Sequence, residues 1–333
     1  MTAVLTVLLS FVASVVTTHV FIRLADQQGV VAEADHRSMH KGATVTGGGL
    51  ALLAAAFAVF VSLWPLESVH RYLLPAAAIV AVVSFVDDLK PVPQWIRFGA
   101  HIGAAIAAVA SVHYAQMIFQ GYLPFWIDRA VAVFALVWFI NLFNFMDGID
   151  GIAGIETVAI AGGFAIVMAA AGMMSPLTGL ALALAGAAGG FLLWNWHPAR
   201  VFMGDVGSVP LGFLCGTLMI WLAVKLSLAA ALILPLYFVA DATITILKRL
   251  FRGEKIWEPH RSHFYQRSAR GVGSHAVVVR RVALCNAVLT GLAVLALSMP
   301  VAAFFVAALS VALLLGWMEF AGAKEFANEA GAQ

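Results

Sequence analysis

The chain alternates between long apolar blocks and short polar segments. Each block has roughly 18 to 22 residues, which lets one helix cross about 30 Å of hydrocarbon. Strands of a membrane barrel would alternate apolar and polar residues over about ten positions, and the sequence shows no such alternation. The pattern therefore predicts an all-α, polytopic membrane bundle with eleven spans, over about 3–22, 45–66, 72–87, 97–118, 129–146, 152–171, 177–195, 207–224, 228–247, 277–298 and 300–319.

The composition agrees with this pattern. Hydrophobic residues make up 62% of the 333 residues and charged residues 11%, whereas soluble domains average about 25% charged residues. No Lys or Arg precedes Arg23, so the first block lacks the basic start of a cleavable signal peptide and predicts a true first span. Cys215 and Cys285 both fall in predicted spans, which argues against a disulfide framework. We expect one integral membrane domain over residues 1–333.

Lysine and arginine predict the orientation of the bundle. Cytoplasmic loops carry an excess of these two residues. With the N-terminus outside, 16 of the 19 Lys and Arg fall on inner segments, and the exceptions are Arg71, Arg129 and Lys225. An odd number of spans then places the C-terminus inside. We therefore predict a periplasmic N-terminus and a cytoplasmic C-terminus.

The uncommon polar segments fall on the same predicted inner face. They are "DHRSMHKGATVTGGG" (35–49), "FVDDLKPVPQ" (85–94), "NLFNFMDGIDG" (141–151), "NWHPARVFMGDVGS" (195–208) and "EPHRSHFYQR" (258–267). Ionisable groups near a bilayer are costly and usually mark function. A helical bundle can bring such loops together. We expect an active-site cleft on the cytoplasmic face, formed by loops at about 23–46, 87–97, 144–152, 195–207 and 248–277.

Asp87 and Asp88 are adjacent carboxylates at the end of the third predicted span. Adjacent carboxylates repel, which raises the pKa of one of them unless a cation lies beside them. One interpretation is a solvated helix end, although acids at a helix C-terminus oppose the helix dipole. The other interpretation is a metal-binding or proton-transfer pair, and the local electrostatic cost favours it.

Asn144, Asp147 and Asp150 recur at intervals of three residues. In a continuing helix these side chains would share one face. Gly148 and Gly151 can loosen or cap that helix end and bring backbone N–H groups close to a ligand. Oxygen ligands of this kind suit Mg²⁺ or Mn²⁺ rather than Zn²⁺. Simple helix capping is the alternative, but caps rarely use so many side chains.

The segment "MGDVGS" places Asp205 in a glycine-flanked turn before the eighth predicted span. Asp205 or Ser208 could simply cap the helix that follows. Alternatively, the N–H groups at the helix N-terminus face an anion, and Asp205 holds the metal ion that accompanies the anion. The motif is short, and by itself it leaves both interpretations open.

The last inner loop is rich in arginine and imidazole side chains. It contains His260, Arg261, His263, Arg267 and Arg270, with Tyr265 and Gln266 among them. Arginine forks and imidazoles suit a diphosphate. Positive-inside topology and attraction to anionic lipids offer an alternative, because basic loops beside the membrane are common. That alternative explains the number of Arg and Lys residues but not the spacing of the histidines.

Together these segments predict a class of reaction. Carboxylates for Mg²⁺, a basic loop for phosphates and a cleft open to lipid favour a soluble phosphate compound and a lipid phosphate as substrates. Phosphoryl transfer between them needs positioning and charge neutralisation more than a protein nucleophile. The sequence has no zinc-spaced Cys and His cluster, no P-loop and no nucleophile elbow. The residues indicate a Mg²⁺-dependent phosphotransferase acting on a lipid, with no nucleic-acid partner.

Two other classes of function are the alternatives. Acids in a membrane protein can relay protons or bind Na⁺, so an ion-coupled transporter is the first. Transporter sites, however, lie near the bilayer midplane, whereas these acids lie at span ends on one face. Asp241, inside the ninth predicted span, is the exception, and the sequence assigns it no role. A purely structural scaffold is the second, although acids at the membrane edge are costly to keep without a task.

Over about residues 5–320, the chain resembles the polyprenyl-phosphate N-acetylhexosamine-1-phosphate transferases of glycosyltransferase family 4. Members begin O-antigen, enterobacterial common antigen and teichoic acid linkage units, and the phospho-MurNAc-pentapeptide translocase is related. The resemblance rests on "RSMH" with "GATVTGGG", then "FVDD", "NLFNFMDGIDG", "MGDVGS" and "HRSHFYQR", in that order. It implies that a UDP-HexNAc and undecaprenyl phosphate react to give undecaprenyl-diphospho-HexNAc and UMP at a bacterial inner membrane.

The resemblance also implies a role for each matched residue. Asp87 and Asp88 would be the catalytic pair, one of them positioning or deprotonating the lipid phosphate. Asp205 and Asp150 would bind Mg²⁺, which Mn²⁺ could replace. The implied substrate-binding residues are Asn144, Asp147, Arg37, His40, Lys41, Arg261, His263 and Arg267. A homodimer is also implied. Direct attack by the lipid phosphate, with one of the paired Asp as base, is favoured over a two-step reaction through an enzyme-bound phosphosugar.

One departure from the superfamily concerns the last loop. Many members carry a run of three His, or His-x-His-His, in this loop, whereas here Tyr265 and Gln266 follow His263. The pattern resembles the branch that acts on 6-deoxy-N-acetylhexosamines, such as FucNAc or QuiNAc, for O-antigen. The resemblance therefore implies UDP-FucNAc or UDP-QuiNAc as the donor, with UDP-GlcNAc as the alternative.

Overall fold

The structure, a computed structural model, describes the chain except for residues 28–30, 33–43, 67–69, 256–259 and 332–333. Helices dominate the described residues. They are α1 (Thr2–Gln27), α2 (Gly49–Leu63), α3 (His70–Leu89), α4 (Gln94–Ala110), α5 (Phe125–Phe145), α6 (Ile152–Ala170), α7 (Pro176–Asn195), α8 (Asp205–Lys225), α9 (Leu228–Ile233), α10 (Leu236–Phe251), α11 (Phe264–Val272), α12 (His275–Leu295) and α13 (Pro300–Gly331). The all-α class predicted from the apolar blocks is confirmed.

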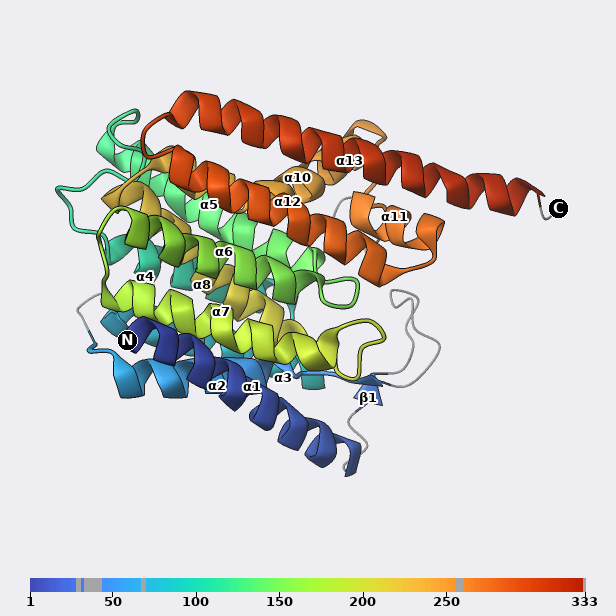
Figure 1. Ribbon diagram of the computed structural model, residues 1–333, viewed down its shortest axis with the longest axis horizontal. Helices are drawn as coiled ribbons and strands as arrows, with labels where there is room; N and C mark the ends of the chain where they lie inside the picture. Colours follow the sequence, from blue (N-terminus) through green and yellow to red (C-terminus); the bar gives the residue numbers. More distant parts are fainter. Residues whose placement is uncertain (28–30, 33–43, 67–69, 256–259, 332–333) are drawn as a thin grey trace.

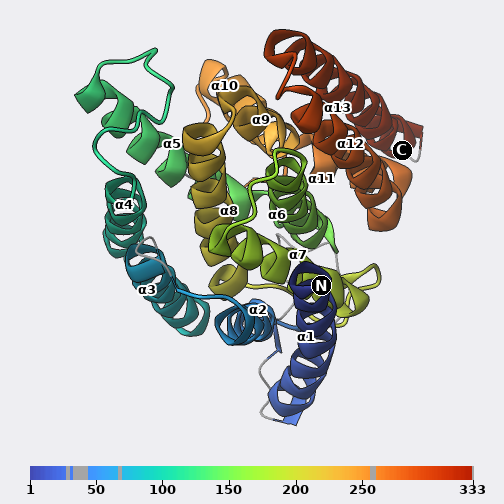
Figure 2. The ribbon, with the colours of Figure 1, turned by 60° about the vertical axis from the view of Figure 1, so that its left-hand side comes forward.

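Helix α8 forms the centre of the bundle (Figure 2). It packs against α2, α3, α4, α5, α6 and α9. Between Asp205 and Lys225 it carries no charged residue, and its whole apolar window is buried. A helix that is apolar on every side is stable only when other elements surround it. Asp205, the first residue of α8, therefore lies at the end of the most enclosed helix.

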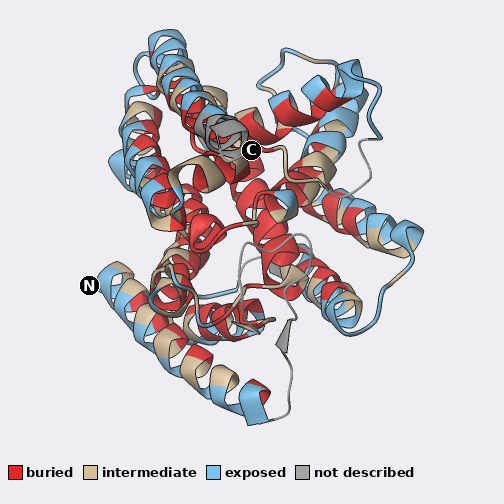
Figure 3. Ribbon diagram, turned by 90° about the vertical axis from the view of Figure 1, so that its right-hand side faces the viewer, coloured by how far each residue is buried: buried red, intermediate tan, exposed pale blue. Residues whose placement is uncertain are grey.

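The outer helices turn apolar faces outward. Figure 3 shows buried residues toward the centre of the bundle and exposed residues along its outside. Large apolar side chains are among the exposed ones, including Phe134 at 71% and Phe305 at 69%. Eight helices among the described residues are long and apolar enough to cross a membrane. The chain is thus a multi-pass membrane protein, while the count of eleven spans and the orientation remain predictions.

Three predicted spans differ in form from the helices observed. Helix α2 has 15 residues and α4 has 17, so both are shorter than the apolar blocks that predict them. The predicted span 228–247 is two helices, α9 and α10, separated at Leu234 and Pro235. Proline lacks a backbone N–H, and its ring collides with the carbonyl four residues earlier, so it kinks or breaks a helix. Pro75 and Pro210 lie inside α3 and α8, whereas the chain breaks between α9 and α10 at Pro235. The prediction of one continuous helix here is wrong for that reason.

The predicted inner segments gather at one end of the bundle. In Figure 1, β1 and α11 lie toward the right, as does the connection between α7 and α8, and the N-terminus lies toward the left. The strands β1 (Val31–Ala32) and β2 (Thr44–Val45) pair antiparallel, and Val45 also bridges Val201 in parallel. These short pairings connect the first polar loop to the segment that leads into Asp205.

Candidate active site

Asp88 binds the N-terminal end of α8. Its Oδ1 accepts a hydrogen bond from the Asp205 N–H at 3.1 Å, and its Oδ2 accepts one from the Val206 N–H at 3.0 Å. The first N–H groups of a helix have no partner within the helix, and a carboxylate there also interacts favourably with the helix dipole. The N-cap residue of α8 is Gly204, which has no side chain that could accept these hydrogen bonds. Asp88 thus fixes the end of α3 to the start of α8.

Asp87 has different partners from its neighbour. Its Oδ2 lies 2.6 Å from Nη1 of Arg97, and its Oδ1 accepts a hydrogen bond from the Val92 N–H at 2.7 Å. Only 11% of the Asp87 side chain is exposed. The ion pair and the backbone bond together hold the turn between α3 and α4. The Arg97 guanidinium therefore neutralises Asp87, one of the two adjacent carboxylates.

Asn144 lies beside Asp205 and the first turn of α8. Its Oδ1 accepts a hydrogen bond from the Ser208 hydroxyl at 2.7 Å, and its side chain also bonds to the Asp205 carboxylate. Helix α5 ends one residue later, at Phe145. The end of α5 therefore contributes a polar side chain to the same place where Asp88 caps α8.

Asp147 follows α5 and joins this group of acids. Burial raises the pKa of Asp147 to about 7, and the carboxylates of Asp205, Asp150 and Asp88 add to the increase. Like charges that lie close together disfavour one another's ionised forms. We call Asp88, Asn144, Asp147 and Asp205 the acid cluster. The possible metal-ligand atoms of this cluster are the carboxylate oxygens of the three Asp residues and the amide oxygen of Asn144. Mg²⁺ prefers oxygen ligands of this kind. The residues present thus fit the predicted ion.

Asp150 lies in a different environment from the one predicted. Its carboxylate is fully buried, with Oδ2 at 2.6 Å from Nδ1 of His197 and 3.3 Å from Nδ1 of His275. The Ala199 N–H donates to the same oxygen at 3.2 Å. Among the described residues, Asp150, His197 and His275 form a group whose ligand atoms lie within 4.8 Å of one another. Imidazoles suit zinc-like ions rather than Mg²⁺, and the shortest distance is that of a hydrogen bond.

The bonds around Asp150 fasten two loops together. The Gly151 N–H donates to Oδ1 of Asn195 at 2.9 Å, and Nδ2 of Asn195 donates to the Val201 carbonyl at 2.8 Å. The φ angle of Gly151 is 79°, a value that glycine adopts readily. The loop that carries Asp147 is thereby held against the segment that leads into Asp205. His197 belongs to a polar segment visible in the sequence, but His275 begins α12, and no sequence pattern links it to Asp150.

Glycines bring the first polar loop to the same place. The N–H groups of Gly48 and Gly49 donate to the carbonyls of Phe202 and Met203, both at 2.9 Å. A Cβ on Gly49 would overlap the backbone of Gly207 in the first turn of α8. Only glycine permits this approach, which explains glycines in both "TGGG" and "MGDVGS". The predicted substrate-binding residues of this loop, Arg37, His40 and Lys41, lie outside the described residues.

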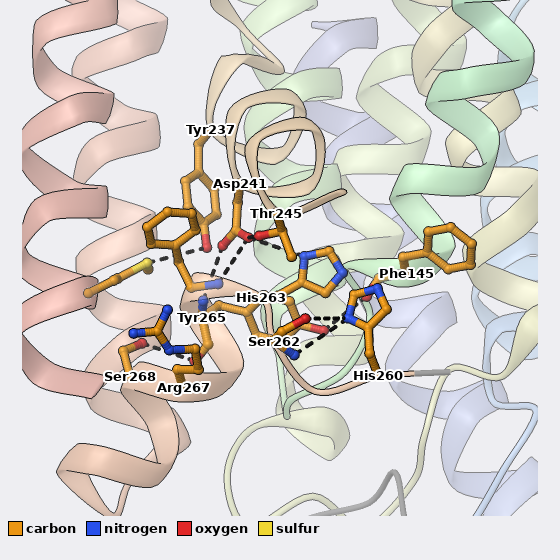
Figure 4. A network of polar contacts seen from close by, with 12 residues as sticks. Phe145, Tyr237, Asp241, Thr245, His260, Ser262, His263, Tyr265, Arg267 and Ser268 are labelled. Atoms are coloured by element: carbon orange, nitrogen blue, oxygen red, sulfur yellow. Dashed lines mark hydrogen bonds and ion pairs between the residues drawn. The ribbon is translucent and has the colours of Figure 1, made fainter. Parts of the chain in front are cut away.

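His263 is held by Asp241. Oδ1 of Asp241 lies 3.2 Å from Nδ1 of His263, and the carboxylate also accepts the N–H groups of Phe264 and Tyr265, both at 3.1 Å (Figure 4). Asp241 therefore caps α11 and orients the imidazole that precedes it. No role could be assigned to Asp241 from the sequence, because its partner His263 lies 22 residues further along the chain.

His260 stacks on His263, with ring centroids 4.9 Å apart. Burial lowers the pKa of His260 to about 4, and the charges of His263 and Arg249 add to the decrease. His260 is therefore neutral at neutral pH. It can donate a hydrogen bond to a phosphate, but it cannot supply a positive charge.

Arg261 and Arg267 do not lie with the acid cluster. Arg267 donates two hydrogen bonds to Glu319 of α13, at 2.7 and 3.2 Å, and Figure 4 shows it on the side of α11 away from His263. The Arg261 carbonyl accepts a hydrogen bond from Arg270 at 3.1 Å. Both side chains line a separate pocket. The structure thus brings His263 alone of these three toward the end of α5.

Tyr265 and Gln266 contact the loop that carries Asp147. The Tyr265 hydroxyl donates to the Phe145 carbonyl at 3.0 Å. A Cβ on Gly148 would overlap the same hydroxyl and would lie 2.9 Å from Nε2 of Gln266. Tyr265 and Gln266 therefore form part of the wall beside the acid cluster.

Comparisons with known proteins identify a family and two relatives of this chain. The model of the family described as "Glycosyl transferase family 4" matches residues 70–223. The chain is 32% identical, over 259 residues, to a phospho-N-acetylmuramoyl-pentapeptide-transferase of Heliobacterium modesticaldum (strain ATCC 51547 / Ice1), covering 69% of this chain and 78% of that protein. It is 28% identical, over 284 residues, to a "Probable undecaprenyl-phosphate N-acetylglucosaminyl 1-phosphate transferase" of Bacillus subtilis (strain 168), covering 78% and 76%.

Proposed function

The chain belongs to glycosyl transferase family 4, and from this membership we propose that it is a polyprenyl-phosphate sugar-1-phosphate transferase. The proposed donor is a UDP-N-acetylhexosamine, and the proposed acceptor is undecaprenyl phosphate. The products are undecaprenyl-diphospho-sugar and UMP. The observation that carries the proposal is the meeting of Asp88, Asp147 and Asp205, from three distant segments, at the N-terminus of α8.

The proposed step is a substitution at the β-phosphorus of the sugar nucleotide. An oxygen of the lipid phosphate forms a bond to that phosphorus, the bond to the bridging oxygen breaks, and UMP leaves with the electron pair. A phosphate monoester has its second pKa near about 6. The lipid phosphate is therefore mostly doubly ionised at neutral pH, and its attack requires no proton removal. This favours direct attack over an enzyme-bound phosphosugar.

Mg²⁺, which Mn²⁺ could replace, would neutralise charge on the diphosphate when bound. Asp205 is the residue proposed to hold it, because Asp205 begins α8 within the acid cluster. Asp147, whose carboxylate interacts electrostatically with that of Asp205, is proposed to share the ion. Asp150 is the other ligand predicted from the sequence. Its bonds to His197 and His275 instead support a positioning role for the loop that carries Asp147.

Asp87 and Asp88 are the predicted catalytic pair. Asp88 accepts two N–H groups of α8, and Asp87 pairs with Arg97. We propose that both residues position the elements around the substrates and that neither removes a proton.

The proposed diphosphate site includes His263, which Asp241 orients toward the end of α5. Arg37, His40 and Lys41 of the first polar loop remain proposed substrate-binding residues. The close approach of Gly49 to Gly207 supports this, since it brings the end of that loop to the start of α8.

The sugar and the pathway are proposed from the last loop. Tyr265 and Gln266 contact the 144–151 loop, and they support a 6-deoxy-N-acetylhexosamine such as FucNAc or QuiNAc over GlcNAc. We place the protein at the start of O-antigen or another envelope glycan. The proposed location is the bacterial inner membrane, with the acid cluster on the cytoplasmic side and the protein as a homodimer.

The test is product formation by the purified full-length chain in detergent. The protein is incubated with undecaprenyl phosphate, Mg²⁺ and, in turn, UDP-GlcNAc, UDP-GalNAc, UDP-FucNAc or UDP-QuiNAc, and the extracted lipid is analysed by mass spectrometry. The expected product has the mass of undecaprenyl-diphospho-sugar, and the best donor identifies the sugar. No lipid product from any donor, with protein that melts cooperatively, would contradict the proposal and favour an ion-coupled transporter.

A further inference from the structure

A second charged site lies beside α11, and Thr245 and Ser262 also line it. Between the end of α10, α11 and α13 the structure has a pocket of about 330 Å³, within the size range of small-molecule sites. We call it the basic pocket. Among the described residues, its charged lining side chains are Lys248, Arg249, Arg252, Arg261, Arg267 and Arg270, together with the carboxylate of Glu319. No step of the proposed transfer reaction uses this site.

The walls of the basic pocket are held in place by specific contacts. Glu319 pairs with Arg267 at 2.7 Å and with Lys248 at 3.6 Å, and Lys248 lies 4.4 Å above the Phe264 ring. Arg249 is buried and donates to Glu254 at 2.8 Å. Positive-inside topology accounts for the presence of such residues, but not for a fixed concave site.

The basic pocket lies where the apolar part of α13 ends. Glu319 is four residues before the end of the span Pro300–Ala323. Large apolar side chains near the pocket-lining residues are exposed, namely Leu247 at 44%, Leu250 at 53%, Phe251 at 86% and Phe320 at 67%. Charged side chains therefore border an apolar surface at the level where a bilayer has its headgroups. A soluble anion would contact only the charged side chains, whereas a lipid would contact both the charged pocket and the apolar side chains beside it.

We propose that the basic pocket binds the phosphate headgroup of an anionic glycerophospholipid, whose acyl chains lie along the exposed apolar faces of α10 and α13. Lys and Arg close to a bilayer attract anionic lipids. Arg forks bind phosphate oxygens in pairs. The proposal goes beyond the transferase reaction, since lipid binding here requires neither a sugar nucleotide nor a metal ion.

The test measures lipid retention by native mass spectrometry of the full-length chain in a neutral detergent, without substrates. Phosphatidylglycerol is compared with phosphatidylcholine of the same acyl chains. The pocket variant is Lys248→Gln with Arg252→Gln, two exposed positions. The matched control is Arg23→Gln with Arg280→Gln, which removes the same charge at exposed positions outside the pocket.

We expect the wild type to prefer phosphatidylglycerol. The pocket variant should bind it roughly twenty-five-fold more weakly, because each of the two removed cations contributes a factor of about five. The control should stay within about twofold of the wild type. An equal loss in the control, or no preference over phosphatidylcholine, would overturn the proposal.

Two competition experiments distinguish a glycerophospholipid from other phosphate compounds. Inorganic phosphate and undecaprenyl phosphate are each added to the phosphatidylglycerol complex at equal concentration. Displacement by either would overturn the assignment to a glycerophospholipid, and retention would support it. If the double variant unfolds, Arg252→Gln alone provides the same comparison with a loss of about fivefold. Product formation is assayed separately, so failure of the transferase proposal leaves this result unaffected.

Discussion

The backbone N–H of Asp205 donates a hydrogen bond to Oδ1 of Asp88 at 3.1 Å, across 117 residues of sequence. The paired aspartates and the "MGDVGS" segment therefore meet through a helix cap. The cap fixes the direction in which α8 begins, and Asp205 is its first residue. The position of the acid cluster depends on this contact between α3 and α8.

The cap predicts a stability effect of Asp88. Replacing Asp88 with Ala removes the acceptor for two helix N–H groups and should cost about 0.5–2 kcal/mol, the range found for N-cap residues. Asp88→Asn keeps one acceptor oxygen and should lose less. The measurement is thermal unfolding in detergent without substrates, with Asp26→Ala at an exposed acid as control. Wild-type melting of Asp88→Ala would show that the cap contributes nothing.

Metal binding should distinguish Asp205 from Asp150. Asp205→Asn should weaken Mn²⁺ binding more than about tenfold, because a charged ligand of a hard cation is lost. Asp150→Asn should weaken Mn²⁺ binding less than Asp205→Asn does, since His197 and His275 engage the Asp150 carboxylate. Electron paramagnetic resonance of free Mn²⁺ measures both.

His197→Gln is the matched control for this comparison. It removes one partner of Asp150 and should resemble Asp150→Asn in metal affinity. If Asp150→Asn loses Mn²⁺ as severely as Asp205→Asn does, Asp150 is a metal ligand and the positioning role is wrong.

The stability of the fold should depend on pH through His260. Its pKa in the folded protein is about 4, whereas an unperturbed histidine titrates near about 6.5. Folding therefore favours the neutral imidazole. The stability that this preference contributes is present above pH 6.5 and is lost as the pH falls toward 4.

Unfolding temperatures between pH 7.5 and 4.5 check this expectation. His260→Gln should flatten the decline below pH 6.5, and His113→Gln, at an exposed histidine, should leave it unchanged. An identical decline in wild type and His260→Gln would contradict the account.

The contact between Gly148 and Tyr265 predicts a pair of compensating substitutions. Gly148→Ala places a Cβ against the Tyr265 hydroxyl, and overpacking of this kind costs about 1–3 kcal/mol. The displaced loop carries Asp147, so product formation should also fall. Tyr265→Phe in the same chain removes the hydroxyl and should restore part of both losses.

Gly291→Ala serves as the control for these substitutions, because a Cβ there meets nothing within 4 Å. Additive losses in the Gly148→Ala, Tyr265→Phe double variant would show that the two residues do not interact as described.

The sequence predicted the helices well because apolar blocks directly reflect the cost of exposing a backbone to lipid. It failed at Pro235, where the apolar block continues through a residue that ends α9. Hydrophobicity alone cannot reveal such a break. The proline itself was the available signal.

The candidate site was predictable in its residue types but not in its pairings. The spacing of Asn144, Asp147 and Asp150 indicates one shared face, yet Asp150 turns to His197 and His275. Such partners come from distant elements and depend on tertiary packing. Arg267 likewise pairs with Glu319 of α13, a residue for which the sequence predicted no role.

The most direct test of the central claim is UMP release by the purified chain. UDP-sugar is supplied with undecaprenyl phosphate and Mg²⁺, and each component is omitted in turn, with a chelator to remove the metal. The account predicts UMP release only when lipid and metal are both present, and a loss of at least about hundredfold in Asp205→Asn, as expected when a group that stabilises the developing charge is removed. UMP release that persists without lipid or without metal, or no release from folded protein with any UDP-sugar, would contradict it.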